Sequence, residues 1–143
     1  MREILFRGKS VNDGGWVQGS LVITTIEPVD DPPIKHHHIE DMTIGVFPNE
    51  FQSGLSETVD PATVGQFTGL TDKNGNMIFE GDIVHCIARL DEANCVVIFE
   101  EGEFRLVPER NYKTYVKGCG FHALRCFSKE VIGNIHDNPE LLN

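Results

Sequence analysis

The sequence predicts a mostly β protein (α+β with minor short helices) that joins an N-terminal β-hairpin region to a C-terminal small β-barrel. Two observations predict this class: runs of alternating apolar and polar residues, and turn-forming Asn, Asp and Gly residues between those runs. About five short strands with tight turns in the second half fit a small barrel. We place the subdomain boundary between residues 1–62, a hairpin and loop region, and residues 63–143, the barrel with a C-terminal helical turn.

The N-terminal residues predict a β-hairpin followed by a loop. Ile4 and Phe6 alternate with charged neighbours, residues 12–15 (Asn-Asp-Gly-Gly) tolerate left-handed backbone angles, and residues 16–23 resume a strand-like run. Residues 27–35 contain three prolines, which interrupt the hydrogen bonds of a ladder. An exposed loop is therefore expected after the hairpin.

Residues 52–64 predict a short helical turn. Asp60 is a residue type that caps helices, and Pro61 follows it at the position where a first helical turn accepts proline. A single 3₁₀ or α turn is therefore expected to lead into the second half.

The second half carries the clearest strand and turn signals. Residues 67–70, 72–75 and 76–79 predict a strand, a tight turn and a strand, because Asn-Gly pairs suit the positive φ angles of hairpin turns. A longer strand follows at residues 83–90. Its alternation predicts that one face meets the core, with side chains Val84, Cys86, Ala88 and Leu90.

Further antiparallel strands are expected at residues 95–99 and around Phe104 and Leu106, whose side chains should point inward. Turn-forming residues separate these strands. The remaining predicted elements are two strands and a closing helical turn, at residues 121–127, 131–135 and 138–142.

Charge composition argues against non-specific nucleic-acid binding. The 143 residues include 22 acidic and 12 basic side chains, a formal net charge of −10. Such a field repels phosphate backbones and anionic lipids at long range. The charged start, residues 1–7, does not resemble a signal peptide, and no apolar run has a membrane-spanning length. We therefore expect a cytoplasmic protein.

The four cysteines are expected to be free thiols. Cys86, Cys95, Cys119 and Cys126 show no Cys-x-x-Cys spacing, and the cytoplasm keeps thiols reduced. Cys86 and Cys126 have apolar neighbours, which predicts that both behave as small buried hydrophobic residues.

Four stretches of the sequence carry a family resemblance: residues 1–4 with Phe6-Arg7, residues 63–75 (TVGQFTGLTDKNG), residues 78–84 (IFEGDIV) and residues 131–142 (VIGNIHDNPELL). In order and spacing they resemble the YopX family, and the resemblance spans nearly the whole chain. It implies a phage or prophage origin, a bacterial cytoplasmic setting and an SH3-like C-terminal part. It implies no reaction, cofactor or catalytic residue.

The resemblance does not extend to residues 29–57 and 105–129, which match no motif of the family. A specific function is therefore expected to reside in these two stretches.

The three adjacent histidines are weak candidates for a metal site. In an extended segment His36 and His38 share a face and would need a third ligand such as Glu40 or Asp41. The alternative is that histidines beside a proline-rich loop are simply exposed, and we favour this alternative because His-rich tracts give frequent false positives. No metal or other cofactor is therefore expected.

No local pattern predicts a catalytic residue. Cysteines and histidines occur without a signature that brings a nucleophile to a base. His85 and Cys86 are adjacent, so in a strand they point to opposite faces. We expect a protein that is not an enzyme.

One segment contradicts the overall charge. Residues 105–129 combine basic groups with aromatic rings, a composition typical of single-strand nucleic-acid surfaces. The alternative is a solvated loop whose cations offset acidic residues elsewhere, and we favour it because of the net charge. The candidate nucleic-acid contacts are Arg105, Arg110, Tyr112, Lys113, Tyr115, Lys117 and Arg125.

The leading hypothesis from the sequence is a phage or prophage accessory protein that binds a protein partner or self-associates, since small barrels often serve as binding modules. The alternative is an accessory factor that binds nucleic acid through residues 105–129. No membrane contact is expected.

Overall fold

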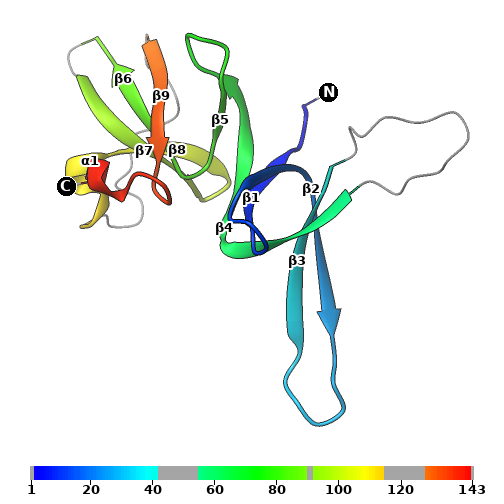
Figure 1. Ribbon diagram of the computed structural model, residues 1–143. Helices are drawn as coiled ribbons and strands as arrows, with labels where there is room; N and C mark the ends of the chain where they lie inside the picture. Colours follow the sequence, from blue (N-terminus) through cyan, green and yellow to red (C-terminus); the bar gives the residue numbers. More distant parts are fainter. Residues whose placement is uncertain (1, 42–54, 90–91, 115–127, 143) are drawn as a thin grey trace, which may run out of the picture. The chain divides into compact units, whose positions relative to one another are not determined.

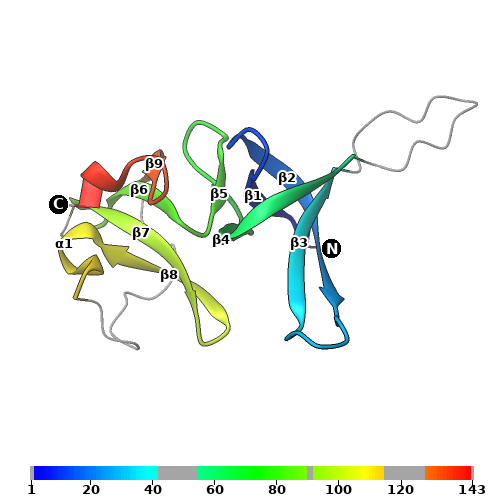
Figure 2. The same cartoon turned by 60° about the horizontal axis from the view of Figure 1, so that its bottom comes forward.

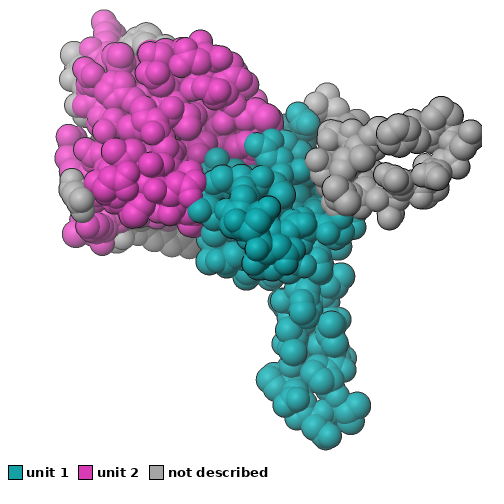
Figure 3. All heavy atoms as spheres, viewed as in Figure 1, with its two compact units in different colours: residues 1–66 teal, residues 67–143 magenta. Residues whose placement is uncertain are grey.

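The computed structural model describes residues 2–41, 55–89, 92–114 and 128–142 (Figure 1). The chain forms two compact units, residues 1–66 and residues 67–143 (Figure 3). The change from one unit to the other falls inside a single strand, and the boundary expected from the sequence, between residues 62 and 63, lies in that same strand. In the described ranges no helix is both long enough and apolar enough to span a membrane.

Unit 1 contains a closed ring of four antiparallel strands. These are β1 (Phe6–Ser10), β2 (Trp16–Ile26), β3 (Ile34–Asp41) and the first part of β4 (Leu55–Thr71). Pairing runs from β1 through β2 and β3 to β4, and β4 pairs again with β1. The predicted mostly β class is confirmed, and the ring extends the N-terminal hairpin that the sequence predicts.

The β1–β2 hairpin follows the turn chemistry of its sequence. The Asp13 carboxylate accepts a hydrogen bond from the Gly15 N–H at 2.7 Å, and Gly14 has a φ of 71°. The Ser10 N–H donates to the Gly15 carbonyl at 2.8 Å. Glycine suits this turn because it adopts positive φ without steric cost.

Gly19 allows β3 to approach β2 closely. A Cβ atom at Gly19 would lie 2.1 Å from the carbonyl oxygen of Glu40 and 3.1 Å from the Ile39 side chain. Gly8 of β1 is also close-packed, because a Cβ atom there would lie 3.0 Å from the Val59 side chain. Two glycines therefore let the four strands of the ring close around the buried pair Ile39 and Val59.

The helical turn predicted for residues 52–64 is wrong for the part that the structure describes. Residues from Leu55 onward belong to β4, which continues past Asp60 and Pro61. Residues 52–54 lie outside the described residues. The local turn chemistry is nevertheless present, because the Asp60 carboxylate accepts from the Ala62 N–H at 3.0 Å.

A bulge explains why β4 continues through a proline. Lys9 of β1 pairs with Asp60 and Arg7 pairs with Gly65, so residues 61–64 stand opposite the single residue between Arg7 and Lys9. The hydroxyl of Thr63 donates to the Asp60 carbonyl at 2.7 Å and accepts from the Lys9 N–H at 2.8 Å. Pro61, at this bulge, needs no N–H for the ladder.

Unit 2 is built on a four-stranded antiparallel sheet with the order β8-β7-β6-β9. The short strand β5 (Met77–Phe79) pairs with the end of β4 as a hairpin. The unit also contains a short helix, α1 (Glu109–Tyr112), and a 3₁₀ turn, η1 (Pro139–Leu142). The sheet strands are β6 (Asp82–Ile87), β7 (Glu92–Glu100), β8 (Glu103–Pro108) and β9 (Ser128–Asn134).

Most predicted elements of unit 2 are confirmed. The strands at residues 67–70, 76–79, 95–99 and 131–135 and the closing turn at 138–142 match observed elements within a few residues. β7 begins at Glu92, where the sequence predicted a turn, because this end of the strand pairs with β6. The strand predicted at 121–127 lies outside the described residues.

The sheet of unit 2 is covered on both faces. One face holds a cluster with Ile78 of β5 above Val84, Cys86, Cys95, Val97 and Leu106. The other face holds Ile83 and Val96, which pack against Leu142 of η1 and Tyr112 of α1. The two described cysteines, Cys86 and Cys95, are buried free thiols, which confirms the prediction for Cys86.

The predicted core face of residues 83–90 is only partly correct. Val84 and Cys86 are buried as expected, but Ile83 on the opposite face is fully buried too, because η1 covers it. Ala88 is exposed beyond the end of β6, and Leu90 lies outside the described residues.

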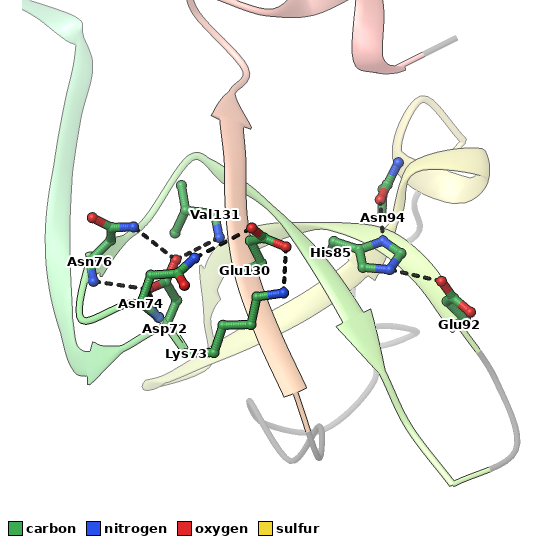
Figure 4. Close-up of polar contacts among 9 residues, drawn as sticks. All are labelled: Asp72, Lys73, Asn74, Asn76, His85, Glu92, Asn94, Glu130 and Val131. Carbon is green, nitrogen blue, oxygen red and sulfur yellow. Dashed lines mark hydrogen bonds and ion pairs between the residues drawn. The ribbon is translucent and has the colours of Figure 1, made fainter.

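The turn at residues 72–75 is organised by one buried carboxylate. Asp72 accepts hydrogen bonds from the N–H groups of Asn74 and Asn76, each at 2.9 Å, and from the Val131 N–H of β9 at 3.0 Å (Figure 4). The Val131 bond is the largest of the effects that lower the pKa of Asp72, to about 2. Asp72 thus fastens the β4–β5 turn to β9.

We predict that Gly19→Ala destabilises unit 1. The new methyl group would overlap the Glu40 carbonyl oxygen, so β2 and β3 must move apart at an estimated cost of about 1–3 kcal/mol. Urea unfolding followed by circular dichroism would measure the loss. The control is Ser20→Ala at the exposed neighbouring position, which should change the free energy of unfolding little. Equal stability of the two variants would contradict the close approach.

We predict that Asp72→Asn lowers the melting temperature at neutral pH, because its amide replaces a charged acceptor of several N–H groups. The folded pKa of Asp72 is depressed, so its stabilisation is present above the unfolded pKa of 3.8 and is lost as pH falls toward about 2. Between pH 3.8 and about pH 2, the melting temperature of the variant should therefore change less steeply with pH than that of the unmodified protein. Parallel pH profiles of the two proteins would argue against this role.

Candidate functional site

The candidate functional site is the ribbon formed by the distal parts of β2 and β3. Seven residue pairs join the two strands, from Ser20 with Glu40 to Ile26 with Ile34. β1 pairs with β2 only as far as Gly19. β3 is paired with β4 only from His38 onward. Figures 1 and 2 show the two strands running side by side beyond the rest of unit 1, and Figure 3 shows them as a narrow arm of that unit.

Apolar side chains are exposed along this ribbon. Ile26 and Ile34 are paired across the strands and are 54% and 50% exposed, and Ile23 is 51% exposed. Val29, in the loop at the end of the ribbon, is 99% exposed. Isoleucine and valine are more often buried in soluble proteins, so a group of them on one element is a feature to explain.

The loop that joins the strands is acidic. Glu27, Asp30 and Asp31 lie between Ile26 and Ile34, and all three are exposed. We call residues 26–34 the ribbon tip. It combines three exposed apolar side chains with three carboxylates, so it repels phosphate groups and attracts cationic surfaces.

The histidine run lies on β3 within the ribbon. His36 and His38 share a face, as predicted, and their rings stack with centroids 6.1 Å apart. The ring nitrogens of His38 lie 3.4 Å from the Thr24 hydroxyl and 3.2 Å from the Thr58 hydroxyl. His38 therefore links β2 and β4 across β3, and this structural role occupies both of its nitrogens.

The metal hypothesis gains no third ligand from the described residues. His37 points to the other face, opposite Ile23, and its buried Nδ1 has no hydrogen-bond partner among the described residues. No group of three or more His, Cys, Asp or Glu side chains in the described ranges is placed to hold a metal ion. The side chain of Asp41 lies outside them, so the weak candidacy of His36 and His38 as metal ligands stays untested.

Arg105, the first candidate nucleic-acid contact, is engaged inside the protein. It is 7% exposed on β8, and its guanidinium lies 2.6 Å from Glu103, 3.3 Å from Glu100 and 3.8 Å from Glu101. The tight β7–β8 turn, with φ of 50° at Glu101 and 83° at Gly102, brings these carboxylates around it. These three carboxylates neutralise the positive charge of Arg105 that would otherwise attract a phosphate group.

The other basic-segment candidates lie at α1 or outside the described residues. Arg110 and Lys113 are exposed on and after α1, while Tyr112 packs against the Ile83 and Val96 cluster. The structure thus does not bring Arg105, Arg110 and Tyr112 onto a shared open surface. The candidates that lie outside the described residues are Tyr115, Lys117 and Arg125.

A second polar cluster surrounds the partly exposed His85 of β6. Its Nδ1 lies 2.8 Å from the Asn94 side-chain oxygen and its Nε2 lies 2.9 Å from the Glu92 carboxylate (Figure 4). The Asn94 amide nitrogen donates to Glu109 at 3.3 Å, which turns the Asn94 oxygen toward His85. Both ring nitrogens therefore face acceptors, an arrangement that favours the doubly protonated ring.

These contacts raise the pKa of His85 above its ordinary value of 6.5. The hydrogen bond with Asn94 contributes most, partial burial opposes it, and the hydrogen bond and negative charge of Glu92 add to the increase, as does the charge of Glu130. Cys86 is buried on the opposite face of β6, which confirms that the two adjacent side chains point away from each other.

Comparison with known proteins gives a family and a fold. Residues 5–143 match the family described as YopX protein. The chain belongs to the YopX family. The crystal structure of protein EF1440 from Enterococcus faecalis is similar, with a TM-score of 0.56 and 26% identity over 100% of both chains. No curated protein matches this sequence.

The ribbon is the feature of this YopX-family chain that sequence reasoning missed. The sequence predicts a strand only over residues 16–23 and none at 34–41, whereas β2 extends to Ile26 and β3 spans Ile34–Asp41. No period-2 signal marks this strand, because Ile34 and Ile39 are five residues apart and the residues between them are Lys and His. No local sequence pattern indicates how far β2 and β3 extend beyond the strands that pair with them.

We predict that the stability of unit 2 falls as pH rises through the raised pKa of His85. The folded protein binds the proton more tightly than the unfolded chain, so this stabilisation is complete below pH 6.5 and is lost above the folded pKa. His85→Gln should flatten the profile of unfolding free energy between about pH 6 and pH 8. Chemical unfolding at several pH values would measure it, with His36→Gln on the ribbon as control. An unchanged slope in His85→Gln would contradict the prediction.

Proposed function

We propose that the protein is an accessory protein, encoded by a phage or prophage and acting in the bacterial cytoplasm, that works as a non-enzymatic binding module. Its contact with a partner protein is made by the ribbon tip, residues 26–34. The observation that supports this most is the pair Ile26 and Ile34, half exposed at the end of a two-stranded ribbon. The family resemblance supports the phage or prophage setting.

Burial of the apolar side chains of the ribbon tip against a partner is energetically favourable. Burying the exposed half of one isoleucine contributes about 1 kcal/mol, so Ile26, Ile34 and Val29 together offer a small hydrophobic anchor. A two-stranded ribbon is only marginally stable alone in water, and side-chain packing from a partner would stabilise it. The tip is therefore suited to insertion into a pocket rather than to exposure.

The charge of the tip defines the chemistry of the partner. Glu27, Asp30 and Asp31 surround the apolar residues, so the partner surface is an apolar depression bordered by lysine and arginine side chains. Nucleic acid does not fit this surface, because its phosphates would meet carboxylates. The alternative, nucleic-acid binding through residues 105–129, has less support since Arg105 is held by three glutamates.

In vivo photocrosslinking from Val29 tests the proposal. A photoreactive amino acid at this 99% exposed position should capture one protein in the bacterium that carries the gene, at a surface with basic residues around an apolar depression. The double variant Asp30→Lys with Asp31→Lys should reduce capture about fivefold or more, because it reverses the charge that orients the partner.

The control places the same photoreactive group at Ile132, which is 39% exposed on β9 of unit 2. The protein captured from Val29 should be missing there. Crosslinks from Val29 to nucleic acid alone, or capture that the charge reversal leaves unchanged, would contradict the proposed function.

A further inference from the structure

One edge of β2 is unpaired over the length of the ribbon. β3 occupies one edge of β2, and β1 occupies the other only from Trp16 to Gly19. From Ser20 to Ile26 no described strand pairs with that second edge. Unpaired backbone N–H and C=O groups on an extended edge form a template for another strand.

The free edge also lacks the usual protection against pairing. β2 has no charged residue from Trp16 to Ile26, and from Ser20 onward it contains no glycine or proline. The neighbouring strand β3 differs, since it carries Lys35, Glu40 and Asp41. In a chain with a net charge of −10, β2 is a long strand along which two copies can approach without placing like charges opposite each other.

We propose that β2 pairs with β2 of a second copy of this chain, antiparallel and about a twofold axis at Ile23. Ile23 is the middle residue of the free stretch from Ser20 to Ile26, so a symmetric alignment of all seven residues places Ile23 of one copy opposite Ile23 of the other. The two ribbons then form a continuous four-stranded sheet with the order β3-β2-β2-β3.

Side chains along this alignment are complementary. Val22 of each copy stands opposite Thr24 of the other, and Leu21 stands opposite Thr25. β-branched and apolar pairs of this kind stabilise antiparallel sheets, and Ile23 is 51% exposed until it is paired. The contact is short, so the dimer is expected to be in dynamic exchange and to dissociate at micromolar concentration.

The dimer does not depend on the partner of the ribbon tip. Antiparallel pairing through β2 places the two tips, residues 26–34, at opposite ends of the shared sheet. A dimer would therefore present two tips at once, and linked contacts increase the apparent affinity for a partner with more than one copy of the docking surface. Loss of tip binding in the crosslinking experiment would leave the dimer intact.

Charge substitution at Ile23 tests the pairing. Light scattering and sedimentation over a concentration series of the full chain should show a monomer–dimer equilibrium. Ile23→Glu and Ile23→Lys should each weaken dimerisation about fivefold or more, because like charges then face each other across the axis. An equimolar mixture of the two variants should dimerise again, since opposite charges now meet.

Two controls separate pairing from folding. Ile23→Thr keeps a β-branched, uncharged residue and should retain the dimer, and Ile132→Glu, on unit 2, adds a negative charge elsewhere and should retain it too. Circular dichroism should show the same fold for all variants. A monomer at all concentrations, equal weakening by Ile132→Glu, or failure of the mixture to restore association would overturn the proposal.

Discussion

The ring and the ribbon of unit 1 both depend on the close approach of β3 to Gly19. Only a residue without a side chain lets the Glu40 carbonyl lie so near the backbone of β2, and this contact occurs where β2 passes from pairing with β1 to pairing with β3 alone. Beyond this point β2 first completes the ring, where Leu21 pairs with Ile39, and then continues into the ribbon. The same strand therefore supplies both the core and the proposed contact surface.

Local chemistry accounts for the parts of the fold that the sequence predicts. The turns at residues 12–15 and 72–75 follow from glycines at positive φ and from aspartates that accept nearby N–H groups, all within a few residues. The segment around Asp60 shows the limit of this reasoning. Its turn chemistry is present, but pairing with β1, about fifty residues away in the sequence, incorporates it into a strand as a bulge.

Pairing between strands that are distant in the sequence also determines which side chains are exposed at the candidate site. Arg105 resembles a surface cation in the sequence, yet the β7–β8 turn places Glu100, Glu101 and Glu103 around it, so its charge serves the hairpin. Conversely, Ile26 and Ile34 resemble ordinary core residues and are half exposed. Composition reports which residues are charged or apolar, but the lengths of the neighbouring strands determine which of them a partner can reach.

The uncharged character of β2 has a consequence for synthesis of the protein. β2 leaves the ribosome before β3 and before Gln66 of β4, the residue that pairs with Phe6 and closes the ring. At 5–20 residues per second, the about forty residues between Ile26 and Gln66 take about 2–8 s to translate. During that interval an extended, β-branched segment without charge is available to chaperones and to other nascent chains. The yield of soluble protein in a cell is therefore expected to depend on how fast translation proceeds from β2 to β4.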